Sequence, residues 1–401
     1  MAVLELHIYG PAFNLPSIDA RCLATIALIQ SNLASDDWCL VPSSDPVINA
    51  FRELPALKDG ALWVTGFRNI ASYLKVYGDW QNATAELSEQ QAADSEAYLS
   101  FLESRGIPLL DLSLYVSSDN YTTCTRSALA EITPWPQSWT IPQQLRDDAR
   151  KRSEHLGLSG LDVDAIREKE LKQENEGIAA QIPKSLRRPK QTVTALLGST
   201  AEQTRFRLEA VTADFFEPLE ELLGEKKYFL SDEMTALDCL VLGILAQMQI
   251  ADLPQPWLKH ALEKKYPKLS VWTKENTEKH FGPATNLRHR PLAERSWTKL
   301  AFDVFNSITD SIPINIAGAQ VRKHSTETKS TKNRADYEQK HMFHVKACRQ
   351  QSLMREIVVS ILSSAGLVGT LLYVGVLSLP QKKPPPTRRN FGEAGALLGL
   401  R

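Results

Sequence analysis

The sequence offers few residues of the types that do chemistry, and they lie far apart. Its five cysteines stand at positions 22, 39, 124, 239 and 348, and none of them forms a Cys-x-x-Cys pair. A redox dithiol needs such a pair, and an odd number of cysteines without a secretory leader is typical of reduced thiols facing the cytosol. The closest histidines, His341 and His344, have no cysteine or carboxylate partner at the spacing of a zinc site. Glycine-rich phosphate loops and Gly-x-Ser-x-Gly elbows are also absent, so we expect no catalytic residue, no metal and no cofactor.

The elements that would position a site begin with an alternating pattern. Leu4, Leu6 and Ile8 alternate with polar residues, which predicts a half-buried strand. The next segment should form a helix, which Ser17 or Asn14 can cap. Its apolar face collects Ile18, Cys22, Ile26, Ile29 and Leu33.

Three further strands and a helix are predicted before residue 80. Residues 38–41 can form a strand, and Asp59-Gly60 between two apolar runs predicts a hairpin. A helical pattern then runs from Phe67 to Tyr77. The order is βαβ followed by ββα, which is the thioredoxin-like arrangement, and Pro55 falls where that fold usually carries a cis-proline.

The layout resembles that of glutathione transferases more closely than that of redox thioredoxins. In the transferases, an acidic or amide residue followed by a serine holds the γ-glutamyl group of glutathione. The matching stretch here is Thr65-Gly66-Phe67, in which Gly66 has no side-chain acceptor and Phe67 has no hydroxyl. We therefore expect a degenerate glutathione site, with Ser17 or Tyr9 as the candidate thiol activator if the chain is an enzyme after all.

The second half of the chain reads as a bundle of helices. Ser88 and Gln91 have the spacing of a capping box, as do Thr235 and Asp238. The uncharged run at 239–250 is too short to cross a membrane and predicts a buried core helix. The Thr235-x-x-Asp238 phrase resembles the buried capping box of the transferase helical domain. Residues 146–205 interrupt this resemblance as a highly charged insert, which we expect to form a solvated helix and a mobile loop rather than a docking arm.

The charges are divided unevenly along the chain. Residues 1–319 hold 32 Lys and Arg against 42 Asp and Glu, whereas residues 320–401 hold 14 against 5. The body is thus acidic and the tail basic, which is a signal about location and argues against a nucleic-acid binder. Within the tail, residues 357–379 are uncharged, and a helix of that length would span about 34 Å against a hydrocarbon core of about 30 Å.

The sequence thus predicts a C-terminal transmembrane helix that anchors the body on the cytosolic side of a membrane. Small residues at four-residue spacing could let this helix pack closely against another in lipid. They are Ser360, Ser364, Ala365, Gly366, Gly369 and Thr370. We expect a thioredoxin-like domain over 1–80, a transferase-like helical domain over 81–317, a polar tether over 318–356, the membrane helix over 357–379 and a short basic tail over 380–401.

A transferase-like fold without its thiol-site residues, joined to a tail anchor, resembles the metaxin family. Four segments carry the resemblance: 54–57 (Leu-Pro-Ala-Leu), 66–74 (Gly-Phe-x-x-Ile-x-x-Tyr-Leu in outline), 111–115 (Asp-Leu-Ser-Leu-Tyr) and 133–136 (Thr-Pro-Trp-Pro). The chain is most similar to the metaxin-like subunit of the mitochondrial sorting and assembly machinery. The resemblance implies a non-enzymatic role in inserting and releasing β-barrel proteins of the mitochondrial outer membrane.

The resemblance also implies the partners. They are the barrel-forming core subunit, a second metaxin-like subunit, β-barrel precursors, the outer-membrane import translocase and membrane lipid, with no nucleic acid. Two alternatives remain open from the residues themselves. One is a membrane-tethered glutathione transferase, and the other is a tail-anchored adaptor at another organelle.

Overall fold

The computed structural model describes residues 3–49, 51, 53–60, 62–77, 87–135, 137–158, 200–250, 253–282 and 288–289. All of them belong to one compact unit, residues 1–342, while residues 343–401 form a second unit that lies outside the described residues. The predicted tether (318–356), membrane helix (357–379), its six small residues, the basic tail, and His341 and His344 also lie outside them. None of the described helices is both long and apolar enough to cross a bilayer.

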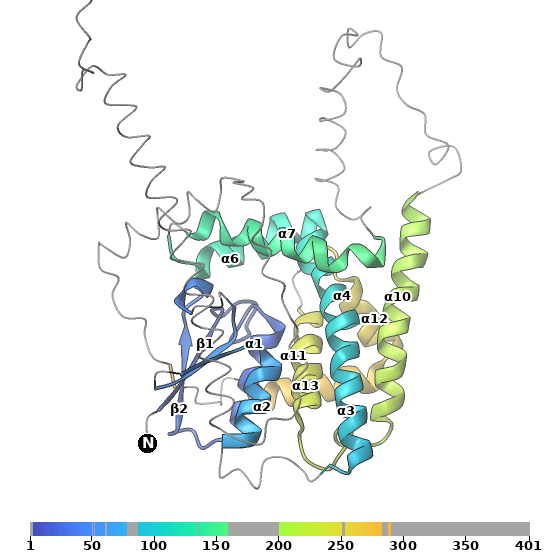
Figure 1. The fold of residues 1–401 in the computed structure, drawn as a ribbon. Helices are drawn as coiled ribbons and strands as arrows, with labels where there is room; N and C mark the ends of the chain where they lie inside the picture. Colours follow the sequence, from blue (N-terminus) through green and yellow to red (C-terminus); the bar gives the residue numbers. More distant parts are fainter. Residues whose placement is uncertain are drawn as a thin grey trace, which may run out of the picture. The chain divides into compact units, whose positions relative to one another are not determined.

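The described strands form one mixed sheet in the order β2-β1-β3-β4. β1 (Leu4–Ile8) pairs in parallel with β2 (Trp38–Pro42) and antiparallel with β3 (Ala56–Asp59). β3 pairs antiparallel with β4 (Leu62–Thr65) across the predicted hairpin, where Gly60 has φ +58°, a left-handed conformation that glycine adopts without strain. This is the thioredoxin-like sheet that the sequence predicts (Figure 1). Between β2 and β3 the described backbone forms only a short 3₁₀ turn, η1 (Pro46–Ile48).

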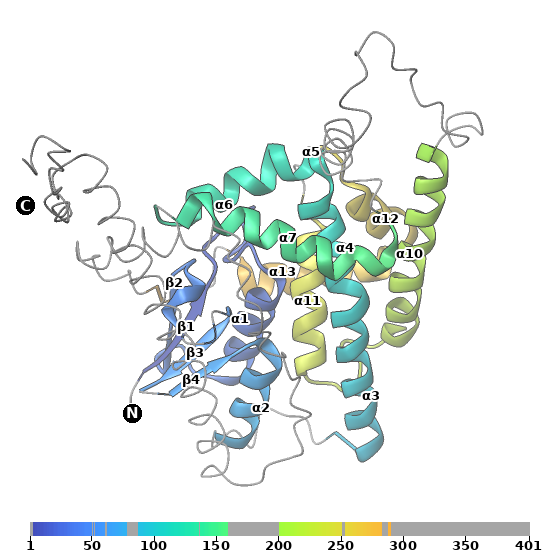
Figure 2. The same cartoon turned by 45° about the horizontal axis from the view of Figure 1, so that its top comes forward.

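Helix α1 (Ala20–Asn32) packs beside the sheet with α2 (Phe67–Tyr77) (Figure 2). The sequence prediction of its cap was wrong. Asp19 is the N-cap, and its carboxylate accepts a hydrogen bond from the Cys22 N–H at 2.9 Å. Ser17 is too early in the chain for this contact, and Asn14 belongs to a separate turn.

The helical half begins with one long helix and a second that folds back from it. Four consecutive elements form the first helix without a break. They are α3 (Glu89–Phe101), the π-helical turn η2 (Leu102–Gly106), α4 (Ile107–Asp111) and a second π-helical turn, η3 (Leu112–Val116). Ser117 leaves the helical conformation, and α5 (Ser118–Asn120), η4 (Tyr121–Thr125) and α6 (Arg126–Ile132) then form the second helix. The short turn η5 (Gln137–Trp139) leads into α7 (Ile141–Ser153), which ends in the turn η6 (Glu154–Leu156).

The remaining helices are α10 (Thr200–Leu223), α11 (Ala236–Met248), α12 (Trp257–Lys265) and α13 (Pro267–Phe281). α11 is the buried core helix that the sequence predicts, since every residue from Leu237 to Met248 is buried. It packs directly on α1 at Gly243, where a Cβ atom would come within 2.3 Å of the Ala20 carbonyl oxygen and 2.9 Å of the Ala24 nitrogen. Only a glycine allows the two backbones to approach this closely.

The predicted insert, 146–205, is ordered at its beginning. Helix α7 runs through its first boundary, and Arg146, Ala149 and Ser153 are buried against the helical half. The expectation of a solvated segment was therefore wrong for residues 146–158. The charged sequence hides this because the buried side of α7 is itself partly charged, a pattern that hydrophobic periodicity does not register.

Candidate functional site

The loop after β1 stands where a glutathione transferase would carry its thiol activator. It begins with Tyr9 and Gly10, and the Gly10 N–H donates a hydrogen bond to Ser44 Oγ at 2.8 Å. The chain then turns tightly, with mutual backbone hydrogen bonds between Ala12 and Leu15 at 3.1 and 2.9 Å. Phe13 and Asn14 have φ of 56° and 61°, as in a type I′ turn. The backbone donors of Gly10, Ala12 and Leu15 are thus used within the protein.

Neither candidate thiol activator is presented to solvent. Ser17 is fully buried, and its hydroxyl oxygen accepts a hydrogen bond from the Asp19 N–H at 3.3 Å. Tyr9 is 8% exposed, and burial, followed by the charge of Asp19, holds the pKa of its phenol well above the ordinary value. Burial also raises the pKa of the Cys22 thiol behind it. Ionised oxygen or sulfur nucleophiles are therefore disfavoured at this position.

The predicted degenerate glutathione stretch lies at the start of α2. The Leu54–Pro55 peptide bond is cis, and the Gly66 N–H donates to the Pro55 carbonyl oxygen at 2.9 Å. Gly66 has φ +81°, and the nearest atom to a Cβ built there would be Glu53 Oε1, at 3.6 Å. The Phe67 side chain is buried, and the Thr65 carbonyl oxygen accepts a hydrogen bond from Asn69. No side-chain hydroxyl or amide of residues 66 and 67 is available for a γ-glutamyl group.

The helical half contains an ion pair whose carboxylate is nearly enclosed. Arg152 of α7 donates from Nε and Nη2 to the two carboxylate oxygens of Asp111 in α4, at 2.7 and 3.0 Å. Burial raises the pKa of the Asp111 carboxyl, and the hydrogen bonds from Arg152 oppose that rise. Tyr115, one turn after Asp111, is half-buried, and desolvation raises the pKa of its phenol. The charges of Asp19 and Arg152 act on the phenols of both Tyr9 and Tyr115, so the two tyrosines share these charged neighbours.

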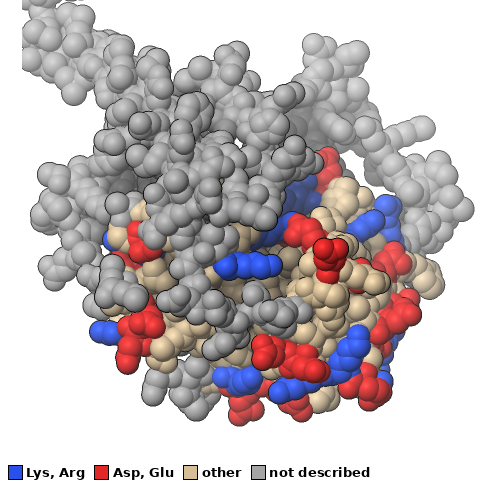
Figure 3. All heavy atoms as spheres, turned by 60° about the horizontal axis from the view of Figure 1, so that its bottom comes forward, with Lys and Arg blue, Asp and Glu red and all other residues tan. Residues whose placement is uncertain are grey.

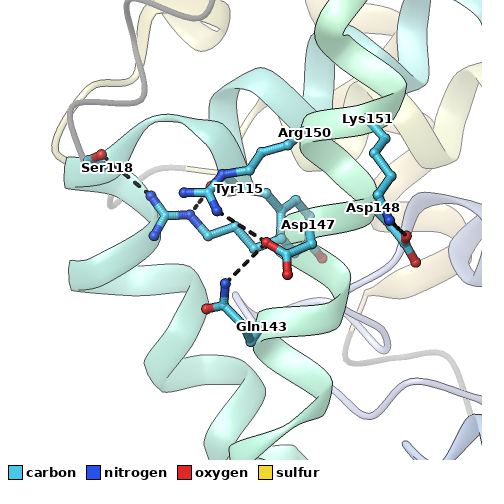
Figure 4. Close-up of polar contacts among 8 residues, drawn as sticks. Tyr115, Ser118, Gln143, Asp147, Asp148, Arg150 and Lys151 are labelled. Atoms are coloured by element: carbon cyan, nitrogen blue, oxygen red, sulfur yellow. Dashed lines mark hydrogen bonds and ion pairs between the residues drawn. The ribbon is translucent and has the colours of Figure 1, made fainter. Parts of the chain in front are cut away.

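A second arginine of α7, Arg146, forms hydrogen bonds at the C-terminal end of η3. Arg146 is 6% exposed, and its Nε donates to the Tyr115 carbonyl oxygen at 3.1 Å. Its Nη2 donates to Ser118 Oγ at 3.4 Å, and its guanidinium lies 4.3 Å from the centre of the Tyr121 ring. Figure 4 shows the hydrogen bonds accepted by Tyr115 and Ser118, together with the pairing of Arg150 with Asp147, which are 3.1 Å apart. The polar face of α7 is therefore committed to holding the helical half together.

Sequence reasoning missed Asp111, Arg146 and Arg152 as structural partners. Asp111 was noted only as part of the Asp-Leu-Ser-Leu-Tyr resemblance, and the two arginines fell inside the predicted insert. A signal existed nonetheless. Asp111 is the only charged residue between Ile107 and Val116, and a lone acid on an apolar helix requires a buried partner.

The two predicted capping boxes are present and help to join the helices. The Thr235 hydroxyl and the Asp238 carboxylate cap α11, and Asp238 Oδ1 also accepts from the Phe229 N–H at 2.8 Å. Ser88 and Gln91 cap α3, and Gln91 Nε2 reaches the Leu230 carbonyl oxygen at 2.8 Å. The caps of two helices that are distant in sequence thus meet on the segment that precedes α11.

The described part of the chain holds no group of three or more His, Cys, Asp or Glu side chains that could bind a metal ion. Acidic and basic side chains alternate on the visible face in Figure 3 rather than gathering by sign. Exposed ion pairs such as Lys274–Glu263 and Lys268–Glu225 are examples of this mixture. This pattern does not favour a nucleic-acid interface.

Comparison with known proteins shows which families the chain resembles. A family model described as "Outer mitochondrial membrane transport complex protein" matches residues 22–146, and one described as "Glutathione S-transferase, C-terminal domain" matches residues 212–275. Metaxin-1 of Mus musculus is 27% identical over 255 residues, which cover 63% of this chain and 68% of the mouse protein. Metaxin-3 of Xenopus laevis is 22% identical over 269 residues, covering 65% of this chain and 72% of that protein. The chain is thus similar to metaxins over about two thirds of its length.

The metaxin matches agree with a transferase-like organisation, in which a thioredoxin-like sheet precedes a helical domain. Among solved structures, a glutathione transferase of Phanerochaete chrysosporium is 13% identical, with a TM-score of 0.42, and covers 70% of this chain and 98% of the transferase. The β-etherase LigF of a Sphingobium strain is 16% identical, with a TM-score of 0.40, and covers 69% of this chain and 95% of the etherase.

Proposed function

We propose that this chain is a non-enzymatic subunit of the sorting and assembly machinery in the mitochondrial outer membrane. Its described body would face the cytosol and help to insert and release β-barrel proteins. The observation that carries the proposal is the closed thiol site of a chain whose family model is described as a membrane transport complex protein. There Ser17 is fully buried, the Gly10 N–H is paired with Ser44, and Gly66 and Phe67 stand in place of the γ-glutamyl contacts.

The physical argument is that the body is built to bind rather than to react. The polar side chains of α7 are paired internally, with Arg152 on Asp111 and Arg146 on the end of η3. Such pairing holds α7 to α4 and η3 within the helical half, which suits a scaffold that holds other subunits. The proposed partners are the barrel-forming core subunit, a second metaxin-like subunit, β-barrel precursors and the import translocase.

The competing enzymatic function receives less support. A membrane-tethered glutathione transferase would need Ser17 or Tyr9 to reach a bound thiol. Ser17 has no exposed surface, Tyr9 is 8% exposed, and the pKa of the Tyr9 phenol is raised by burial. Both hydroxyl groups are therefore buried, and a bound thiol could not reach them without a rearrangement of this loop.

Affinity purification from detergent-solubilised mitochondria tests the proposed function. The full chain is expected to recover a β-barrel membrane protein and a second metaxin-like protein. Recovery of neither, with the bait intact and membrane-bound, would overturn the proposal.

The proposed anchor is tested separately by removing residues 351–401. The truncated chain should appear in the soluble fraction after carbonate extraction, and its retention in the membrane would rule out the anchor. A fusion of residues 340–401 to a fluorescent protein should label mitochondria. Labelling of the endoplasmic reticulum would instead favour an adaptor at that organelle.

A further inference from the structure

The turn between α6 and α7 exposes two tryptophans side by side. The Trp139 side chain is 76% exposed and that of Trp135 is 52% exposed, and their rings meet edge to face with centroids 6.4 Å apart. We call this feature the tryptophan corner, meaning Trp135, Trp139 and the turn that joins them. Other large apolar side chains that are exposed in the described residues, such as Phe206 and Val271, lie on α10 and α13 without an exposed aromatic partner. Single exposed apolar residues are ordinary, whereas a paired aromatic patch marks an interaction site.

Two backbone hydrogen bonds hold the chain around the tryptophan corner, and this stretch of sequence carries no charge. The Ser138 N–H donates to the Pro134 carbonyl oxygen at 3.2 Å, and the Thr140 N–H donates to that of Gln137 at 3.0 Å. No charged residue occurs from Ile132 to Leu145, between Glu131 and the buried Arg146. The corner could therefore enter a low-dielectric environment without removing a charged side chain of this stretch from water.

The corner lies at the end of the sheet where the parallel strands β1 and β2 finish. Ile132 Cβ is 3.2 Å from the position that a Cβ of Gly10 would occupy, and Gly10 directly follows β1 and is hydrogen-bonded to Ser44, just after β2. Residues 288–289 lie along β2, where the Leu40 N–H donates to the Arg288 carbonyl oxygen at 2.9 Å and His289 pairs with Leu40 in parallel. The last described residues therefore run along β2 toward the end of the sheet that carries the corner. Beyond them the sequence continues to the predicted membrane helix.

We propose that the tryptophan corner inserts into the headgroup region of the membrane that anchors the chain. This inference rests on the proposed function, because it needs the body to be held at a membrane. Tryptophan prefers the boundary between hydrocarbon and water, since its ring is apolar and its N–H can remain hydrated. A tether raises the effective concentration of the bilayer at the corner, so a contact that is weak on its own is sufficient. The contact would turn the β1 and β2 end of the sheet toward the lipid.

Tryptophan fluorescence of the full chain in lipid nanodiscs tests the insertion. The nanodiscs contain phosphatidylcholine that is brominated near the headgroup end of its acyl chains, because bromine quenches only tryptophans that reach that depth. The predicted membrane helix contains no tryptophan, so it adds no background. Relative to unbrominated lipid, the unchanged chain should be quenched. The double variant Trp135→Gln with Trp139→Gln should lose at least roughly half of that quenching.

The matched control is Phe206→Gln, which removes an equally exposed apolar ring from another part of the body and should leave the quenching unchanged. Equal thermal unfolding of the variants shows that they are folded. If the chain is incorporated into nanodiscs but the double variant is quenched as strongly as the parent, the corner does not enter the lipid and the inference is wrong. If the chain is not incorporated at all, the proposed anchor fails instead, so the two failures are distinguishable.

Discussion

Arg152 donates from Nε and Nη2 to the two carboxylate oxygens of Asp111, so that the last turn of α7 is fixed to α4 by two charged hydrogen bonds of 2.7 and 3.0 Å. The Asp111 side chain is 6% exposed and that of Arg152 is 40% exposed. The carboxylate is thus nearly enclosed, while one side of its partner remains in water. An enclosed carboxylate that keeps its charge depends on that partner far more than a surface ion pair does.

Replacing the arginine should therefore be costly. In Arg152→Ala the Asp111 carboxylate would be left buried without its charged partner, and we expect the free energy of unfolding to fall by about 2–3 kcal/mol. This is below the range for fully buried pairs because Arg152 is partly solvated. Urea unfolding of the detergent-solubilised chain measures the change. The neighbouring Lys151→Ala is the matched control, since Lys151 is 76% exposed and pairs only with the exposed Asp148 in Figure 4. It should cost less than about 1 kcal/mol. Equal losses in the two variants would contradict the assignment.

The contact of α11 with α1 predicts an unusual response to alanine. In most helix interiors Gly→Ala stabilises by about 1 kcal/mol. Gly243→Ala should instead destabilise by about 3 kcal/mol or more, because its methyl group would meet the backbone of Ala20 and Ala24, which cannot rotate away. The sign of the change in the unfolding midpoint decides the matter. A stabilised Gly243→Ala protein would mean that the two helices are farther apart than described.

The cap of α11 offers a graded pair of variants. Thr235→Ala removes one capping oxygen and should cost about 1 kcal/mol of unfolding free energy. Asp238→Ala removes the acceptor for both the Thr235 and the Phe229 N–H groups, each at 2.8 Å, and should cost roughly twice as much or more. Thermal unfolding of both variants gives the order. A larger loss for Thr235→Ala would show that the Asp238 carboxylate is not the centre of the cap.

His280 predicts a dependence of stability on pH. It is buried in α13, and burial, followed by the charge of Lys279, lowers its pKa to about 4 from an ordinary value near 6.5. Between these two values the unfolded chain binds more protons at this residue than the folded chain does. The contribution of His280 to stability is therefore complete above about pH 6.5 and is lost as the pH falls toward about 4, with a ceiling of about 3 kcal/mol.

The variant His280→Gln isolates this effect, because glutamine does not titrate. The difference in unfolding free energy between the parent and the variant should change steadily as the pH falls from about 7 to 4.5. The parent should lose the larger amount. A pH-independent difference would show that His280 is not buried in its neutral form.

The closed thiol site predicts that the chain does not bind glutathione. Isothermal titration of the purified full chain with glutathione should give no saturable heat at physiological concentrations, because Gly66 and Phe67 lack the side-chain contacts for the γ-glutamyl group. An active glutathione transferase in the same detergent is the control for the assay. Saturable binding, or turnover of an electrophilic substrate, would contradict both this prediction and the non-enzymatic function.

Much of the fold could be predicted because its signals are local. The alternation of Leu4, Leu6 and Ile8, the Asp59-Gly60 turn and the two capping boxes each depend on a few adjacent residues. Such patterns survive in a sequence whatever the rest of the chain does. They sufficed to predict the thioredoxin-like sheet and the buried helix α11.

The parts that were missed depend on partners far away in the chain. Asp19, rather than Ser17, is the N-cap of α1. The start of the helix is two residues later than predicted because the tight turn at Phe13 and Asn14 precedes it. The many charged residues of α7 predict a solvated helix. The prediction fails because Arg152 pairs with Asp111, which lies 41 residues earlier, and the sequence does not show that pairing. The exposure of Trp135 and Trp139 likewise depends on how the neighbouring helices pack, which the sequence alone does not show.

The close fit at Gly243 also has a consequence for how the protein is made. α1 is complete after Asn32, but the helix that covers it ends only at Met248. At about 5–20 residues per second, a ribosome needs roughly 10 to 40 s to deliver the intervening chain. During that interval the face of α1 that packs on α11, which contains Ala20 and Ala24, remains uncovered. We therefore expect the apolar surface of the N-terminal domain to need protection by chaperones during synthesis. The domain is complete only when α11 has been made and covers α1.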